Sequence, residues 1–209
     1  AGRDTTRWVV GAGAAIGFGI WATHFVAMLG YDPGVIAGYN LPSTVISLLV
    51  AIAMTTVSFF VALARPNRGG LAVASVIGGS GVAAMHYLGM SALELPATMH
   101  WHPGMVGASI AFAILPMYPA LSLAVRGKTM RSGAVAGLLM TLAIVLLHFT
   151  GMAAVVLVPA PLEMRSAALV SPATMAGAAG AASRRLLAIC SAVLTISRQA
   201  HRALQTNAP

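Results

Sequence analysis

Charged residues are scarce in this chain. Only 8% of its 209 residues are Asp, Glu, Lys or Arg, whereas about a quarter of a soluble globular domain is charged. Apolar stretches recur between short polar breaks, and each is close to the roughly 20 residues that a helix needs to cross a hydrocarbon core about 30 Å thick. The composition therefore argues against a water-soluble fold and predicts an integral membrane protein.

Cysteine and acidic residues are also rare, which limits the kinds of metal site and catalytic site that the chain can form. Cys190 is the single cysteine, so it has no partner for an intrachain disulfide or for a cysteine-based zinc or iron–sulfur site. The net charge is +8, but the basic residues stand in short clusters, which does not indicate nucleic-acid binding. We find no nucleophile with a base, no phosphate-binding loop and no paired catalytic carboxylates, so we do not expect an enzyme.

The apolar stretches predict five membrane-spanning helices and a less regular sixth. The five cover residues 8–29, 43–64, 70–93, 105–125 and 133–158. The sixth is expected at about residues 167–183 or longer, because Arg184 and Arg185 follow and each costs roughly 2.5–3.5 kcal/mol at a helix centre. The fold class is therefore all-α, a polytopic transmembrane helical bundle. We assign residues 1–196 to one transmembrane domain and residues 197–209 to a short basic cytoplasmic tail.

Basic residues in the short loops indicate the orientation, because Lys and Arg are enriched on the cytoplasmic side of membrane proteins. In the loops on the other side, Arg165 is the only Lys or Arg residue. We therefore expect that side to be periplasmic or extracellular. The residues expected on the cytoplasmic side are Arg3, Arg7, Arg65, Arg68, Arg126, Lys128, Arg131, Arg198 and Arg202.

One motif occurs three times with a spacing of 62 residues, and each copy has a histidine, an aromatic residue and, four positions after the histidine, a methionine. Four residues turn a helix by about 400°, so the two side chains lie on one face roughly 6 Å apart. The fold is thus built from three helical-hairpin repeats, each with its histidine near the outer end of its first helix. The pairs are His24 and Met28, His86 and Met90, and His148 and Met152.

The three motifs should lie at one depth and converge, since glycines on these helices allow close backbone approach. Imidazole and thioether together favour copper, with methionine selecting Cu(I), whereas zinc and magnesium sites more often include carboxylate or thiolate. The sequence therefore predicts a copper site near the outer membrane face. The alternative is that the histidines only pack and hydrogen-bond to carbonyl groups, with methionine as apolar filler.

Other polar and aromatic residues near the outer face receive simpler interpretations. His100 and His102 are interpreted as exposed loop histidines in preference to a metal-capture site, and Glu94 as an interfacial carboxylate in preference to an acceptor behind the metal ligands. The aromatic residues are interpreted as anchors in the membrane–water interface, where amphipathic rings are enriched. These are Trp21, Tyr31, Tyr87 and Trp101.

At its histidine motifs the sequence resembles the MHYT domain family of bacterial membrane sensors. The resemblance covers about residues 8–160 and includes Met85-His86-Tyr87-x-Gly89-Met90 and His148-Phe149-Thr150-Gly151-Met152. It implies a sensory input module of the bacterial inner membrane, with a metal site toward the periplasm, that binds copper and thereby detects O2, CO or NO. The ligands that it implies are His24, Met28, Met85, His86, Met90, His148 and Met152.

The resemblance also implies a signalling partner. Many family members continue into cytoplasmic cyclic-di-GMP synthesis or breakdown domains, or into a histidine kinase. Thr23 and Leu147 replace the leading Met of the motif, and Leu88 replaces its Thr. The family usually has another helix before the one at Trp8, so we expect the chain to be truncated at its start and to lack an output domain.

Two other functional classes remain open at this stage. A membrane haem protein for electron transfer would clamp iron between two histidines, which leaves one histidine and the three methionines without a role. A copper-handling transporter would place its site between helical-hairpin repeats, but the repeats of many transporters are inverted, whereas these keep one orientation. Both are alternatives to the copper-dependent sensor.

Overall fold

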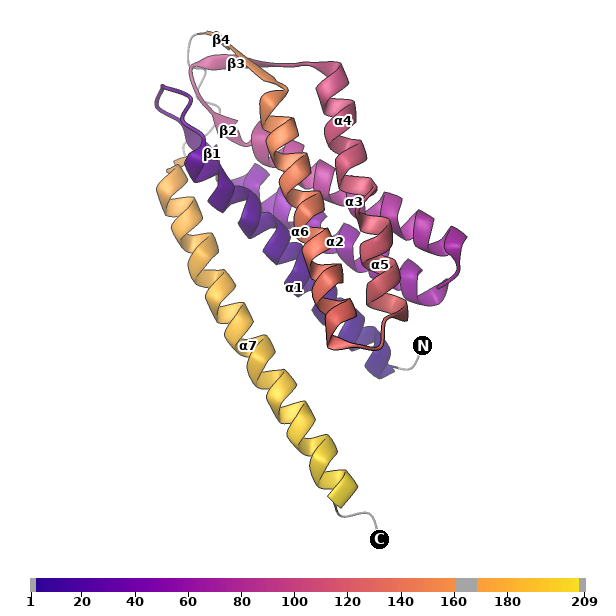
Figure 1. The fold of residues 1–209 in the computed structure, drawn as a ribbon. Coiled ribbons are helices and arrows are strands. Elements are labelled where there is room, and N and C mark those ends of the chain that lie inside the picture. Colours follow the sequence, from indigo (N-terminus) through magenta and orange to yellow (C-terminus); the bar gives the residue numbers. More distant parts are fainter. Residues whose placement is uncertain (1–2, 161–168, 207–209) are drawn as a thin grey trace.

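The computed structural model describes residues 3–160 and 169–206, and these form a helical bundle with small strands at one end (Figure 1). The first helix, α1, continues into one 3-10 turn, Met28–Gly30. Within these described residues, five segments are long and apolar enough to cross a membrane, by length and composition. The predicted all-α, multi-pass fold is therefore confirmed. The helices are α1 (Arg3–Ala27), α2 (Leu41–Ala64), α3 (Arg68–Ser91), α4 (Pro103–Ile114), α5 (Met117–Arg126), α6 (Met130–Ala153) and α7 (Pro172–Thr206).

Side-chain caps define where three of the long helices begin. The amide oxygen of Asn40 accepts a hydrogen bond from the backbone N–H of Ser43 at 3.1 Å, at the start of α2. Asn67 does the same for Gly70 at 2.8 Å in α3. Thr129 begins α6 with reciprocal hydrogen bonds to Ser132. Each cap satisfies an N–H that the helix itself leaves without a partner.

The fourth span consists of two helices, because α4 ends at Ile114 and α5 begins at Met117. Pro116 lies between them, and its ring has no N–H to continue a helical hydrogen-bond ladder. The end of α4 packs closely on α3 at Gly79, where a Cβ would lie 2.7 Å from the Cα of Ile114. A glycine at this position lets the two backbones approach each other.

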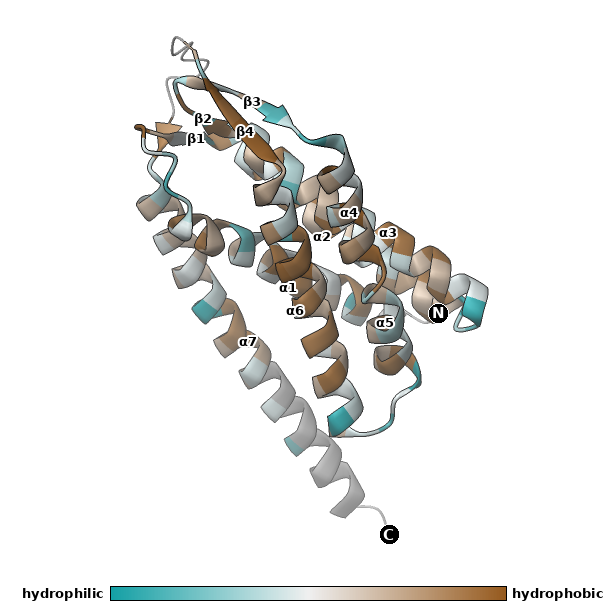
Figure 2. Ribbon diagram, turned by 45° about the horizontal axis from the view of Figure 1, so that its top comes forward, coloured by the Kyte–Doolittle hydropathy of each residue, from teal (hydrophilic) through white to brown (hydrophobic). Residues whose placement is uncertain are grey.

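Large apolar side chains are exposed on the spanning helices, and the colouring of Figure 2 shows that hydrophobic residues recur along these helices. Leu49 is 59% exposed, Leu138 69% and Phe149 65%. Soluble proteins rarely present contiguous apolar patches larger than a few hundred Å². These exposed side chains are therefore suited to contact lipid.

Short strands connect the ends of the helical repeats at one end of the bundle (Figure 1). Strands β1 (Gly38–Asn40), β2 (Leu93–Glu94) and β5 (Leu169–Val170) form an antiparallel sheet in the order β2-β1-β5. Strands β3 (Ala97–Trp101) and β4 (Val155–Pro159) form an antiparallel pair. Because these strands follow α1, α3 and α6, they hold the corresponding ends of the three repeats together.

The span predicted at residues 133–158 is wrong at its C-terminal end. Helix α6 ends at Ala153, and β4 occupies Val155–Pro159. Valine is β-branched and packs well on a pleated strand, and β4 satisfies its backbone by pairing with β3. The same pairing places His100, expected in a loop, within β3.

The sixth helix is continuous, and its C-terminal end agrees with the prediction of residues 167–183 or longer. Helix α7 runs from Pro172 to Thr206, so Arg184 and Arg185 do not interrupt it, and the boundary expected at residue 196 falls inside it. The start expected at residue 167 lies outside the described residues. Figure 1 shows α7 beside α1, with its C-terminal part extending past the other helices. It contacts α1, and its residues Met175 and Ala179 are buried.

The second helices lie between the first helices of successive repeats. Helix α2 contacts both α1 and α3, and α4 contacts both α3 and α6. The first helices α1, α3 and α6 also contact one another, and α7 packs back on α1. This arrangement brings equivalent positions of the three repeats to the centre of the bundle.

Candidate metal centre

Three histidines, one from each repeat, meet in the centre of the bundle. The Nδ1 atom of His24 on α1 lies 3.2 Å from Nδ1 of His86 on α3 and 3.3 Å from Nδ1 of His148 on α6. All three offer a nitrogen within 4.8 Å of the others. Their exposed fractions are 2%, 0% and 4%. The sequence prediction that the histidines converge is therefore confirmed as geometry.

The three rings contact one another edge to face. Their centroids are 5.0 Å apart for His24 and His86, and 5.3 Å apart for each of the pairs that include His148. The angles between the ring planes range from 78° to 87°. In this arrangement each ring keeps one nitrogen within 4.8 Å of a nitrogen of each of the other two rings.

Two glycines make room for these rings. A Cβ on Gly89 of α3 would lie 2.6 Å from Nε2 of His24, and a Cβ on Gly151 of α6 would lie 2.5 Å from Nε2 of His86. Each glycine stands three positions after the histidine of its own repeat. The histidine of one repeat thus packs on the glycine of the next, and this contact sets the position of its ring.

The spacing of the nitrogens suits a metal ion. Two nitrogens bound at about 2.0–2.1 Å to one tetrahedral ion are roughly 3.3–3.4 Å apart, close to the 3.2 and 3.3 Å seen around Nδ1 of His24. A neutral imidazole carries one proton, so an Nδ1 that faces two others cannot donate to both. The donor set therefore fits a cation held at the Nδ1 atoms.

The outer nitrogens of two rings support the same interpretation. Among the described residues, Nε2 of His24 and Nε2 of His86 are buried without a hydrogen-bond partner. A buried polar atom left in this way costs about 1–3 kcal/mol, and such atoms call for an explanation in the function of a site. The Nε2 edges of these two rings pack against Gly89 and Gly151, which keeps the Nδ1 atoms directed inward and leaves the Nε2 atoms without a partner.

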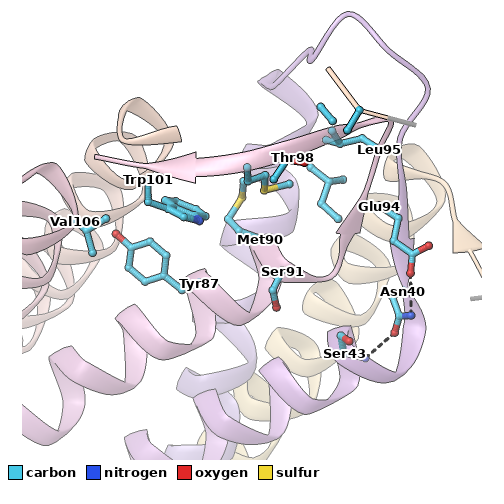
Figure 3. Close-up of a pocket in the computed structure, with 14 residues that line it drawn as sticks. Asn40, Ser43, Tyr87, Met90, Ser91, Glu94, Leu95, Thr98, Trp101 and Val106 are labelled. Atoms are coloured by element: carbon cyan, nitrogen blue, oxygen red, sulfur yellow. Dashed lines mark hydrogen bonds between the residues drawn. The ribbon is translucent and has the colours of Figure 1, made fainter. Parts of the chain in front are cut away.

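The predicted methionines belong to the hydrophobic core of the bundle. Met28, Met85 and Met90 are buried, and Met152 packs against the core in a half-buried position. Met90 lines a cavity at the strand end of the bundle, which none of the three histidines lines (Figure 3). The structure therefore assembles the three histidines of the predicted ligand set into one group, and the metal-binding role of the methionines stays a prediction.

His100 and His102 do not join the central histidines. Both are exposed, His100 in β3 and His102 immediately before α4. The backbone N–H of His102 donates to the carbonyl oxygen of Ala154 at 2.9 Å, which continues the pairing of the two chain segments beyond the strands.

Trp21 is not the interfacial anchor that the sequence suggested. It is 7% exposed, and its indole N–H lies 3.1 Å from the hydroxyl oxygen of Ser47 and 3.3 Å from the carbonyl oxygen of Thr44. Both acceptors are on α2. A tryptophan three positions before His24 therefore fixes α1 against α2, and polar residues within an otherwise apolar span were the only sequence signal for this contact.

Aromatic residues surround the histidines, and the sequence did not indicate their roles. Phe25 meets the ring of His24 edge to face at 4.8 Å and the ring of Tyr39 at 5.0 Å. Tyr39 is buried in β1, and burial raises the pKa of its phenol, which stays protonated. These rings close the space around His24 at the strand end of the bundle.

The fold and the site together define a class: multi-pass membrane proteins of repeated helical hairpins whose first helices converge on buried histidines. The sequence matches the MHYT family, described as a bacterial signalling protein N-terminal repeat, over residues 17–75 and 79–137. These two segments make up more than half of the chain, and they begin 62 residues apart, the period of the histidine motif. The chain belongs to the MHYT family.

Curated relatives are signalling proteins. An uncharacterized signaling protein of Caulobacter vibrioides is 40% identical over 152 residues, which cover 73% of this chain and 19% of that protein. In Pseudomonas aeruginosa, the cyclic di-GMP phosphodiesterase NbdA is 42% identical over 164 residues, covering 73% of this chain and 21% of NbdA. The bifunctional diguanylate cyclase/cyclic di-GMP phosphodiesterase MucR is 39% identical over 161 residues, covering 73% of this chain and 23% of MucR.

The chain spans about a fifth of the length of these relatives. No solved structure matches it. The relatives therefore identify the family, while the activity of a whole protein that contains this chain is a matter for proposal.

Proposed function

We propose that this chain is a membrane-embedded sensory input module that binds copper at His24, His86 and His148, near the periplasmic face. The single observation that carries the proposal is the meeting of three buried histidines from three repeats, with Nδ1 of His24 at 3.2 and 3.3 Å from Nδ1 of the other two. A methionine of the predicted set (Met28, Met85, Met90 and Met152) supplies the further ligand.

The donor chemistry favours copper over other ions. Imidazole suits copper and zinc, but thioethers in the surrounding core select Cu(I). Within the described residues, the metal-ligand group contains histidine alone, with no carboxylate or cysteine. A hard cation such as Mg²⁺ or Ca²⁺ requires oxygen ligands, so these ions do not suit the site.

Haem is the weaker alternative on geometry. A haem iron held by two histidines has a flat macrocycle between the two rings. The three imidazoles here contact one another at centroid distances of 5.0 and 5.3 Å. This arrangement leaves no slot for a macrocycle between any two of them.

The distribution of basic residues supports the orientation. Arg126, at the end of α5, donates two hydrogen bonds to the carbonyl oxygen of Pro66, so the α2–α3 and α5–α6 connections lie side by side. Both connections carry Lys or Arg, which favour the cytoplasmic side. The histidines lie toward the opposite ends of α1, α3 and α6, and that side is periplasmic in the proposal.

In the proposed sensory step, a change at the metal acts on three helices at once, because its three histidine ligands come from three different repeats. Bound copper would supply a coordination position for a diatomic molecule such as O2, CO or NO. A change at the site then alters the fit of α1 against α3 and α6, and α7 packs on α1. The proposed partner is a cytoplasmic signalling protein or domain, such as a cyclic-di-GMP enzyme of the kind named in NbdA and MucR or a histidine kinase.

The test is elemental analysis of the detergent-purified chain, produced with added copper, together with its visible absorption spectrum. His86→Ala removes one member of the buried triad, and His100→Ala is the matched control on an exposed histidine. We expect near-stoichiometric copper in the wild type and His100→Ala, a large loss in His86→Ala, and no Soret band. Equal copper in the wild type and His86→Ala would refute the assignment, and a Soret band would favour haem.

A further inference from the structure

The buried triad needs an access route from outside the bundle. Its three histidines are at most 4% exposed, so an ion cannot reach them directly from solvent. A metal site of this kind requires a path by which the ion arrives. The described residues offer a cavity of about 810 Å³ at the strand end of the bundle.

This cavity, which we name the outer cavity, is lined by two thioethers and two aromatic rings. Met90 and Tyr87 belong to α3, and Met99 and Trp101 belong to β3. Figure 3 shows Tyr87 beside Trp101, with Met90 next to them. The centroids of the Tyr87 and Trp101 rings are 5.1 Å apart.

The lining of the outer cavity suits a soft monovalent cation. Thioether sulfurs are soft ligands that select Cu(I) over harder ions. The faces of tryptophan and tyrosine attract cations through their ring quadrupoles. Glu94 also lines the cavity and accepts a hydrogen bond from the amide of Asn40 at 3.1 Å, which places a carboxylate within its wall.

Tyr87 on α3 links the wall of the outer cavity to the triad. The ring of Tyr87 contacts Trp101 on one side and the ring of His86 on the other, at 5.0 Å. Met90 follows His86 by four residues, which is about one helical turn nearer the strand end. An ion bound at Met90 and Met99 would therefore be about one turn from its next ligand.

We propose that the outer cavity is a capture site for Cu(I) or another soft monovalent cation, which first meets the half-buried Met99 and Trp101 and is then held between Met99 and the buried Met90. The cation would pass from this site to the histidine triad. The inference rests on the proposed copper function but assigns a second site, with Met99 as a ligand and Trp101 as a cation–π contact, neither of which belongs to the histidine motif.

The experiment is a titration of the full chain in detergent and chloride-free buffer with Ag(I), a soft monovalent probe. Two readouts are followed: silver bound per chain after desalting, and tryptophan fluorescence. The chain has three tryptophans, and Trp101→Phe identifies the share of quenching that comes from the outer cavity. Met99→Leu removes one thioether, and Met130→Leu is the matched control, because Met130 is 83% exposed at the start of α6.

We expect more than one silver ion per wild-type chain and quenching that is absent in Trp101→Phe. Met99→Leu should weaken the quenching phase by about tenfold or more, since loss of even supporting contacts at metal sites costs 10–100-fold in affinity. Met130→Leu should behave as the wild type, and His86→Ala should retain the quenching while binding less silver.

The two proposals fail in different ways. Unchanged silver binding and quenching in Met99→Leu would overturn the capture site and leave the triad intact. Unchanged silver stoichiometry in His86→Ala would instead overturn the triad as a metal site. A wild type that binds a single silver ion without quenching would also contradict the capture site.

Discussion

Replacing Gly89 by alanine tests whether the position of a histidine ring is set by the neighbouring repeat. The new Cβ would lie 2.6 Å from Nε2 and 3.0 Å from Cδ2 of His24, whereas ordinary contacts of a Cβ are 3.4–4 Å. The His24 ring must therefore move by about 1 Å, or the backbones of α1 and α3 must separate by a similar distance. Overpacking of this kind costs typically 1–3 kcal/mol.

The displacement affects the metal site more than the fold. Metal–ligand distances tolerate deviations of about 0.2 Å, so a shift of about 1 Å at Nδ1 of His24 removes this nitrogen from the ligand set. His24 is the histidine whose Nδ1 faces both of the others. We therefore expect Gly89→Ala to lower the copper content several-fold while the protein still purifies as a folded membrane protein.

The assay combines copper content with thermal unfolding in detergent. Gly137→Ala in α6 is the control, since a Cβ there meets nothing within 4 Å and alanine favours a helix over glycine by about 1 kcal/mol. That variant should keep its copper and unfold at the same or a higher temperature. Full copper occupancy in Gly89→Ala, with unchanged affinity, would show that the ring is not held by this contact.

Two further substitutions test the packing that positions the triad. Trp21→Phe removes the indole N–H that contacts Ser47 and Thr44. This variant should lower the free energy of unfolding by about 1–3 kcal/mol, because buried acceptors lose their donor, and it should retain its copper content. An unchanged unfolding temperature would contradict this. Gly79→Ala would place a Cβ 2.7 Å from the Cα of Ile114, so it should lower the unfolding temperature. Gly107→Ala on α4 is the control and should not lower it, because a Cβ there meets open space. Equal unfolding temperatures of the two variants would argue against close packing of α3 on α4.

The spans and the convergence of the three histidines could be predicted because both follow from local periodicity. Length and apolar composition locate a membrane helix, and the 62-residue spacing places His24, His86 and His148 at equivalent points of three hairpins. Convergence then required only that the first helices pack together, which they do. None of these steps depends on which side chain faces which neighbour.

The features that the sequence did not reveal depend on contacts between distant segments. The valines of β4 are apolar enough to continue α6, and only pairing with β3 decides that they form a strand. Trp21 has the composition of an interfacial anchor, but Ser47 and Thr44 on α2 supply its buried acceptors. Composition records the polarity of a residue, whereas its partner is known only once the helices are placed.

The repeat makes the three histidines equivalent in sequence, but packing makes them unequal. His24 packs on Gly89 and His86 on Gly151, and the corresponding position of the first repeat is Ala27. His24 has its Nδ1 close to both other Nδ1 atoms, and its helix α1 packs against α7. Under the proposed function, a change in coordination at His24 therefore has a direct physical route through α1 to the helix that extends beyond the bundle.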